Sequence, residues 1–334
     1  GRDENFFELG GDSILSIQVV ARAREAGLRV TPRMLFEHPT VAGLAGASER
    51  AATVAPVIPA WSGEAPLLPM QHWFLDQTFS EPSHWNLTVA LDTREPLDAQ
   101  AVRRAVAALV EHHDALRARF EHDGTHWRQV IEPPGAPEAD LLVLEASPGE
   151  SFEAAVGRCA QRLNTSLDIE RRPVVRFGIV ADRSHASTTL VLAAHHLVVD
   201  GVSLRLLVED FDRAYRQAQT GGGVGLPPRT LPAATWAAAL AEAARAGRFD
   251  GDLDHWRRLA DTPPAVFPLD RTAAGPREET TAAATLELDE RETGDLLRVS
   301  GSAGERVEDV FLAALASSSA LRTGAGSFYV ELEG

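Results

Sequence analysis

The apolar residues of the first 47 positions recur at helical spacing. Over Ser13–Ala26 they share one face of a helix, and Gly27 then supplies a stop. Thr31, placed ahead of a proline, predicts a second short helix that reaches Phe36, and Thr40 can cap a third. We therefore expect residues 1–47 to form a very small all-α bundle.

A change of composition separates this bundle from the rest of the chain. Residues 48–64 are mostly alanine, proline and small polar residues, which is typical of a linker. Over residues 65–334 helical spacing alternates with β-rich runs, as in layered acyl-transfer folds. The predicted helices are Ala99–His113, Ser151–Leu163, Val202–Ala218, Trp236–Ala246, Leu253–Leu259 and Glu305–Leu321. The predicted strands are Thr125–Ile131, Val174–Val180, Thr188–Ala194, Thr285–Leu288 and Phe328–Leu332, and residues 263–282 are expected to be extended.

Composition narrows the classes of partner. The 334 residues are 44% hydrophobic, which predicts two or three domains with a substantial core. The net charge of −16 argues against nucleic acid or an anionic membrane as the main partner. The single cysteine, Cys159, excludes an intrachain disulfide and has the helical spacing of a core residue. No signal peptide opens the chain and no apolar run approaches the ~20 residues of a membrane helix, so we expect a cytoplasmic protein.

Ser13 follows two glycines and Asp12 at the start of a predicted helix. The glycines permit a tight turn, and the free N–H groups at a helix start suit a phosphate ester on the serine. An ordinary helix cap after a turn would have the same pattern. No histidine stands beside Ser13, so nothing local would make it a hydrolytic nucleophile.

Two adjacent histidines, His195 and His196, follow the apolar strand Thr188–Ala194, and Asp200 and Gly201 then turn the chain into a helix. Side chains alternate along a strand, so only one of the two histidines can point into a given cavity. A histidine at a strand end suits a general base, and Asp200 could hold the loop or pair with an arginine. Two structural histidines remain an alternative. Metal binding is disfavoured because no third ligand is obvious.

Three further patterns carry weaker signals. The run from Glu111 to Phe120, with two histidines and Asp114, is interpreted as a solvated, salt-bridged helix end. The aromatic run Pro66–Phe74, followed by Trp85, is interpreted as core rather than as the lining of a substrate site. Glu331 and Glu333 would share one face of a buried-looking strand, which is unusual for carboxylates.

Together these motifs resemble a known family. Residues 3–14 are similar to the core of a peptidyl carrier protein, in which the serine bears a phosphopantetheine arm. His195–Gly201 is similar to the His-His-x-x-x-Asp-Gly motif of the condensation superfamily of nonribosomal peptide synthetases. The features that resemble epimerisation domains rather than amide-forming condensation domains are Asp12, Gln71–Phe74, His112–Arg117, Val199–Ser203 and Glu333–Gly334.

The resemblance implies a small all-α carrier bundle and then an α/β (α+β) lobe like chloramphenicol acetyltransferase, with the second lobe largely missing. Residues 1–47 would be an N-terminally truncated carrier, 48–64 a linker, and 65–334 a C-terminally truncated epimerisation or condensation-like domain. The segment on its own would be inactive.

The resemblance also implies the chemistry, which is inversion of the α-carbon of an aminoacyl or peptidyl thioester in antibiotic biosynthesis. His196 and Glu333 would be catalytic, one on each side of that carbon, and His195, Asp200 and Gly201 would be structural. Ser13 would carry 4′-phosphopantetheine, added by a phosphopantetheinyl transferase, and no metal is implied. The partners would be an upstream adenylation domain and a downstream condensation domain. Peptide-bond condensation, a non-catalytic recruitment platform and a carrier joined to an inert remnant are the alternatives.

Overall fold

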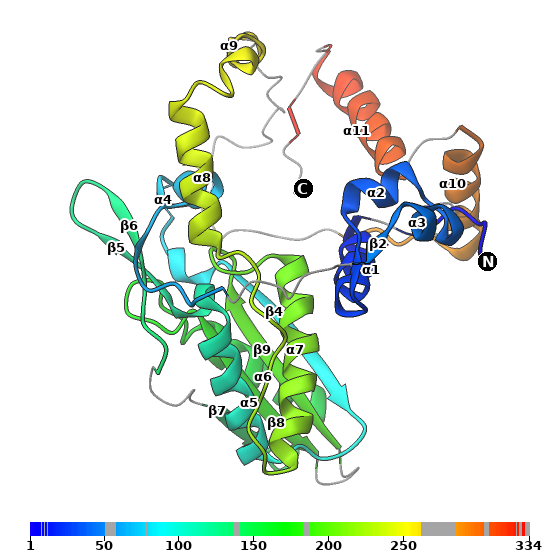
Figure 1. Cartoon of the computed structure of the whole chain (residues 1–334). Helices are drawn as coiled ribbons and strands as arrows, with labels where there is room; N and C mark the ends of the chain where they lie inside the picture. The colour runs from blue at the N-terminus through cyan, green and yellow to red at the C-terminus, as the bar shows by residue number, and fades with distance from the viewer. Residues whose placement is uncertain are drawn as a thin grey trace. The chain divides into compact units, whose positions relative to one another are not determined.

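The structure is a computed structural model that describes residues 1–334, apart from residues 8, 10, 12, 51–57, 78, 136–140, 183–186, 262–284, 304–306, 325, 327–328 and 331–334. It divides into two compact units, Gly1–Leu240 and Ala241–Gly334. The main helices and strands are labelled in Figure 1. The helical bundle and the mixed lobe both belong to the first unit.

The N-terminal bundle has the three predicted helices, α1 (Ser13–Glu25), α2 (Pro32–Glu37) and α3 (Val41–Ala47). The predicted caps are confirmed, because the Thr31 and Thr40 hydroxyls accept hydrogen bonds from the Met34 and Gly43 amides. Parts of the expected linker form short strands. Its residues 49–50 form β2 (Glu49–Arg50), which pairs with β1 (Leu28–Arg29), and its end forms β3 (Gly63–Ala65).

The lobe is built on a four-stranded sheet with the strand order β4-β9-β8-β7. Its strands are β4 (Asn86–Thr93), β7 (Leu141–Glu145), β8 (Val175–Asp182) and β9 (Ser187–His195). Strands β7 and β8 are parallel, which requires a crossover, and α6 (Phe152–Asn164) supplies it. The two central strands confirm the predicted β-rich runs. The edge strands β4 and β7 were not predicted.

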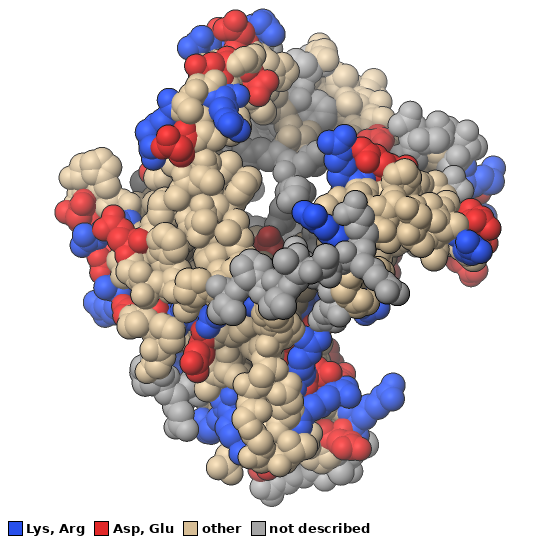
Figure 2. Space-filling view, in the orientation of Figure 1, with Lys and Arg blue, Asp and Glu red and all other residues tan. Residues whose placement is uncertain are grey.

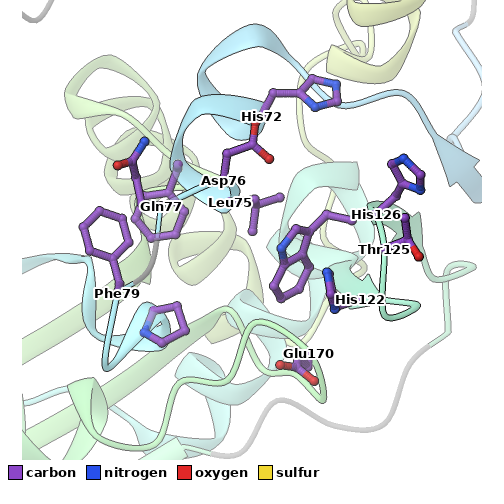
Figure 3. A pocket seen from close by; sticks show the side chains of 12 residues that line it. His72, Leu75, Asp76, Gln77, Phe79, His122, Thr125, His126 and Glu170 are labelled. Atoms are coloured by element: carbon purple, nitrogen blue, oxygen red, sulfur yellow. The ribbon is translucent and has the colours of Figure 1, made fainter.

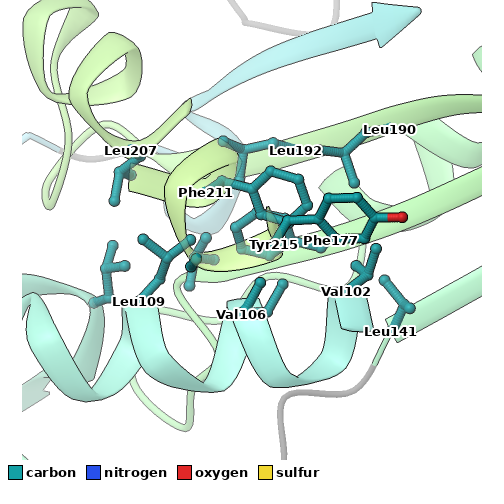
Figure 4. Close-up of a cluster of buried hydrophobic side chains, with 14 of the residues drawn as sticks. Val102, Val106, Leu109, Leu141, Phe177, Leu190, Leu192, Leu207, Phe211 and Tyr215 are labelled. Atoms are coloured by element: carbon teal, nitrogen blue, oxygen red, sulfur yellow. The ribbon is translucent and has the colours of Figure 1, made fainter. Parts of the chain in front are cut away.

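Alternate residues of β8 and β9 face two different helix layers. On one face, Phe177, Leu190 and Leu192 pack against α5 (Ala99–His112) and α7 (Gly201–Gln219), which lie side by side (Figure 4). On the other face, Val180 and Val191 pack against α6. A central strand buried on both faces has a continuous apolar run, which is why the sequence predicted these two strands well.

A second sheet has the order β3-β6-β5 and carries a separate core cluster. It contains the hairpin of β5 (Ala118–His122) and β6 (Trp127–Ile131). Phe74 and Leu75 of α4 (Pro69–Leu75) pack into this cluster, as does Ala234 of α8 (Ala233–Arg245). Three short 3-10 segments, η1 (Pro82–His84), η2 (Asp114–Arg117) and η3 (Asp250–Asp252), complete the irregular connections.

The second unit contains α9 (Leu253–Ala260), α10 (Glu290–Ala303) and α11 (Val307–Thr323). Helices α9 and α11 confirm predictions, whereas α10 was not predicted. The predicted strand Thr285–Leu288 is wrong. Those residues are irregular, both leucines are exposed, and no strand of the described chain pairs with them. The predicted extended segment 263–282 lies outside the described residues, as does most of the predicted strand Phe328–Leu332.

Within the described residues, no helix combines the length and the apolarity that crossing a membrane requires. Acidic and basic side chains are interspersed over the face seen in Figure 2.

Candidate functional site

His195 is the last residue of β9 and is fully buried. Its Nδ1 accepts a hydrogen bond from the Leu197 amide at 3.1 Å, so the ring proton belongs on Nε2, which donates to the Pro82 carbonyl at 2.7 Å. Burial lowers the pKa of His195 to about 4; the bond to Pro82 opposes this change, and the neighbouring His196 adds to it. His195 is therefore a neutral imidazole that hydrogen-bonds both the segment before β4 and the turn after β9.

His196 begins the turn after the strand and is exposed. Its amide donates to the Trp85 carbonyl at 2.8 Å, which fixes its backbone to the start of β4. One histidine of the pair thus faces the interior and the other does not, as side-chain alternation predicts.

A side chain of helix α4 hydrogen-bonds the loop that follows the two histidines. Gln71 is buried, its Nε2 donates to the Leu197 carbonyl at 2.9 Å, and its Oε1 accepts from the Leu68 amide at 2.8 Å. The Phe74 ring packs edge-on against both the His195 ring and the Trp85 ring, with centroids 5.6 and 5.8 Å apart. The Phe74 contacts agree with the core interpretation of this aromatic run, but Met70 and Trp73 contradict it because they are exposed.

Asp200 and Gly201 start α7. The Asp200 Oδ1 accepts a hydrogen bond from the Ser203 amide at 2.6 Å, so Asp200 is the N-cap of that helix and Gly201 is its first residue. Of the two functions considered for Asp200, this bond corresponds to holding the loop.

Ser13 is the first residue of α1. The turn before it requires glycine at position 11, because a Cβ there would lie 2.5 Å from the Phe6 carbonyl oxygen. Gly10 and Asp12 lie outside the described residues, as do the second proposed catalytic residue, Glu333, and its neighbours Glu331 and Gly334.

The end of α5 differs from the predicted solvated helix end. Arg117 is completely buried and donates to the Glu132, Val110, Glu111 and Trp61 carbonyls and to Asp114. Asp114 also binds Arg229 and accepts from the Trp61 amide at 2.9 Å. The predicted ion pairing is therefore present, but in the interior, where it joins segments more than 100 residues apart in the chain.

The His112–His113 part of this motif faces α7. The His113 Nε2 lies 3.0 Å from the Asp210 Oδ2. Burial, together with the adjacent His113 and Arg229, lowers the pKa of His112 to about 4, although Asp210 and Asp114 oppose the change.

A pocket of about 530 Å³ lies beside α4 and the β5–β6 hairpin (Figure 3). Phe74, Phe79 and Trp127 supply apolar walls, and the rest of the lining mixes polar and charged side chains, among them three histidines and two carboxylates, with further apolar ones. His196 does not line this pocket, so the pocket and the exposed histidine are separate features of the lobe.

The family comparisons agree with this layout. A family described as "Condensation domain" matches residues 61–318, and one described as "Phosphopantetheine attachment site" matches residues 1–47. Because the first match covers more than half of the chain, the protein belongs to the condensation-domain family, with a phosphopantetheine attachment domain ahead of that domain. The prediction of a small helical carrier followed by a mixed α and β lobe of this superfamily is confirmed.

Particular relatives refine this comparison. The chain is similar to two different polypeptides of the linear gramicidin synthase of Brevibacillus parabrevis, at 39% identity over 341 residues and 36% identity over 340 residues. Each alignment covers 100% of this chain, but the chain spans only 6% and 4% of those relatives.

Among solved structures, the epimerization domain from the third module of tyrocidine synthetase B is similar, with a TM-score of 0.72 and 29% identity over 81% of this chain and 62% of that one. The first condensation domain of the CDA synthetase shares the fold, with a TM-score of 0.60 and 23% identity over 79% of this chain and 64% of that one.

Sequence reasoning missed the positioning function of Gln71 and Phe74. A glutamine on the inward face of an otherwise apolar helix start was the available signal, because a buried amide needs partners that only tertiary structure supplies.

Proposed function

We propose that this chain is the carrier and epimerisation segment of a nonribosomal peptide synthetase, and that it inverts the α-carbon of a carrier-bound aminoacyl or peptidyl thioester. One observation carries the proposal. His196 is exposed in the turn after β9, while its neighbour His195 is buried and held by two hydrogen bonds. The 29% identity to an epimerization domain supports the choice of reaction.

The carrier would deliver the substrate. Ser13 at the start of a 13-residue helix, after a turn that only glycine fits, suits a phosphate ester. The phosphopantetheine arm would present the substrate as a thioester, whose carbonyl group acidifies the hydrogen on the α-carbon.

His196 would exchange a proton between one imidazole nitrogen and the α-carbon of the substrate. Its backbone is fixed by the hydrogen bond to Trp85, and its loop is fixed by Gln71, so the base would be positioned before the substrate arrives. Inversion needs proton exchange on both faces of the carbon, and Glu333 is proposed for the opposite face. His195 and Asp200 would position the loop without touching the substrate.

Chiral analysis of the thioester tests the proposed reaction. The complete synthetase that carries this chain is loaded with an L-aminoacyl group, the thioester is cleaved, and the enantiomers are separated. We expect D-aminoacyl product from the native enzyme and only the L form from the His196→Gln variant.

An exposed histidine elsewhere provides the control, and His255→Gln should leave the enantiomer ratio unchanged. The alternative reaction gives a different result. If the native enzyme leaves the thioester in the L form and the His196→Gln variant loses amide-bond formation between two carrier-bound substrates, the domain catalyses condensation and the proposal is wrong.

A further inference from the structure

A second group of potential ligand side chains lies away from His196, where α5 meets α7. His112 is the last residue of α5, His113 is its C-cap, and Asp210 faces them from α7. One ring nitrogen from each histidine and one carboxylate oxygen of Asp210 all lie within 4.8 Å of one another. Among the described residues this is the only such cluster of three.

These three groups are a donor set for a transition metal. Two imidazoles and one carboxylate hold Zn²⁺ in many proteins, with bonds of roughly 2.0–2.2 Å and a water as the fourth ligand. Ligand atoms around a tetrahedral ion are then about 3.3 Å apart. His113 Nε2 and Asp210 Oδ2 are already 3.0 Å apart, so this pair is close to the required spacing.

The extended backbone of His113, with φ −94° and ψ 106°, is what brings two adjacent histidines to one point. On a continuous helix, neighbouring side chains diverge. Because α5 ends at His112, the His113 ring departs from the helix direction, and the two ring centroids lie 4.9 Å apart. All three side chains are half-buried, so they can rotate the remaining distance without repacking the core.

The electrostatic surroundings both favour and limit a cation. The Asp210 carboxylate supplies the negative charge of the cluster, whereas the last carbonyls of α5 already accept hydrogen bonds from Arg117 and Arg229. Two arginines oppose a bound cation. Arg213 lies 4.0 Å from the second oxygen of Asp210, and Arg229 shares the Asp114 carboxylate with Arg117, so its charge is only partly balanced.

We infer that His112, His113 and Asp210 form a binding site for a divalent transition metal, with Zn²⁺ as the best match to its ligands, and that the ion joins the end of α5 to α7. The site is separate from the proposed base His196 and does not depend on the proposed epimerisation. Its effect would be on the stability of the lobe rather than on the chemical step.

The experiment is a titration of the chelator-treated chain with Zn²⁺, followed by calorimetry, and with Co²⁺, followed by visible absorption. We expect one saturable equivalent per chain and the intense spectrum of a tetrahedral cobalt site. Asp210→Asn and His112→Gln each keep a polar side chain but lose a good ligand, so each should weaken binding about tenfold or more.

His255→Gln is the matched control, because it removes an exposed histidine outside the cluster. It should leave the affinity unchanged. Zn²⁺ should also raise the thermal midpoint of the native chain and of this control, but not of Asp210→Asn. Failure of the native chain to bind one saturable equivalent, or undiminished binding by both cluster variants, overturns the inference.

Discussion

His195 and His196 are adjacent, yet their surroundings differ completely. His195 has no exposed surface and makes a hydrogen bond through each ring nitrogen, whereas His196 is exposed at the turn. Protonation of His195 would place a charge in the interior and would remove the acceptor of the Leu197 amide. This residue therefore contributes to stability only as the neutral imidazole.

The first prediction concerns pH. The pKa of His195 is lowered from 6.5 to about 4 in the folded protein, so the unfolded chain binds the proton more tightly. The contribution of His195 to stability is complete above its pKa in the unfolded chain. It is lost as the pH falls from there toward its pKa in the folded protein. Between about pH 7 and about pH 5 the loss is about 2 kcal/mol. Urea unfolding at both pH values measures the change in the free energy of unfolding.

His195→Gln keeps a donor and an acceptor but cannot take up a proton. Between the two pH values this variant should lose about 2 kcal/mol less stability than the native chain. An identical pH dependence in both proteins would contradict the assignment of a neutral, buried His195.

The second prediction concerns Ser13. Incubation of the folded chain with coenzyme A and a phosphopantetheinyl transferase should raise its intact mass by one phosphopantetheine arm. The mass increase should be absent in Ser13→Ala and present in Ser16→Ala, a serine buried within the same helix. A modified Ser13→Ala protein would mean that the attachment site is elsewhere.

Helix α5 ends on a network of charges rather than in solvent. Asp114 accepts hydrogen bonds from two guanidinium groups and from the Trp61 amide. These bonds join α5 to the segment just before β3 and to the segment before α8. Removal of the carboxylate leaves positive charge in the interior without its counterion.

The third prediction follows from this network. Asp114→Ala should lower the free energy of unfolding by about 3 kcal/mol, since a buried ion pair loses one partner. Asp212→Asn removes an exposed carboxylate from an ion pair on α7 and should cost less than about 0.5 kcal/mol. Chemical denaturation compares the two, and equal midpoints would contradict the proposed importance of the network.

The contact of α6 with β8 gives a fourth prediction. A Cβ at Gly178 would lie 2.5 Å from the Cys159 sulfur, so Gly178→Ala should cost about 1–3 kcal/mol. Cys159→Ala removes that sulfur. The double variant should therefore be more stable than the sum of the two single effects predicts, and simple additivity in the mutant cycle would show that the clash is relieved elsewhere.

Over the whole chain, the sequence predicted those helices and strands whose apolar residues recur with a regular period. A regular pattern of apolar residues, which the fold buries, allowed the prediction of strands 174–180 and 188–194 and of the helices that cover them. The edge strands β4 and β7 were missed because they are only partly buried and show weaker patterns. Helix α10 was missed because its sequence contains two glycines and few apolar residues.

Residues of the candidate site could be selected from the sequence where they belong to one contiguous motif, but not where the fold brings distant residues together. His195, His196, Asp200 and Ser13 could be selected from short motifs. The contacts of Gln71 with Leu197 and of Asp114 with Arg229 join residues 126 and 115 positions apart, so no local pattern could reveal them. The burial of Arg117 had no local signal either, because two of its five acceptors are carbonyl groups of distant segments, those of Glu132 and Trp61.

Deuterium uptake at the α-carbon of the substrate measures whether His196 moves the proton there. The complete synthetase is loaded with an aminoacyl group in D₂O, and the released amino acid is analysed for deuterium at the α-carbon. We expect deuterium uptake by the native enzyme and its loss in His196→Gln, with loading of Ser13 unchanged. Native uptake by the His196→Gln enzyme would show that another group is the base and that the proposed function of His196 is wrong.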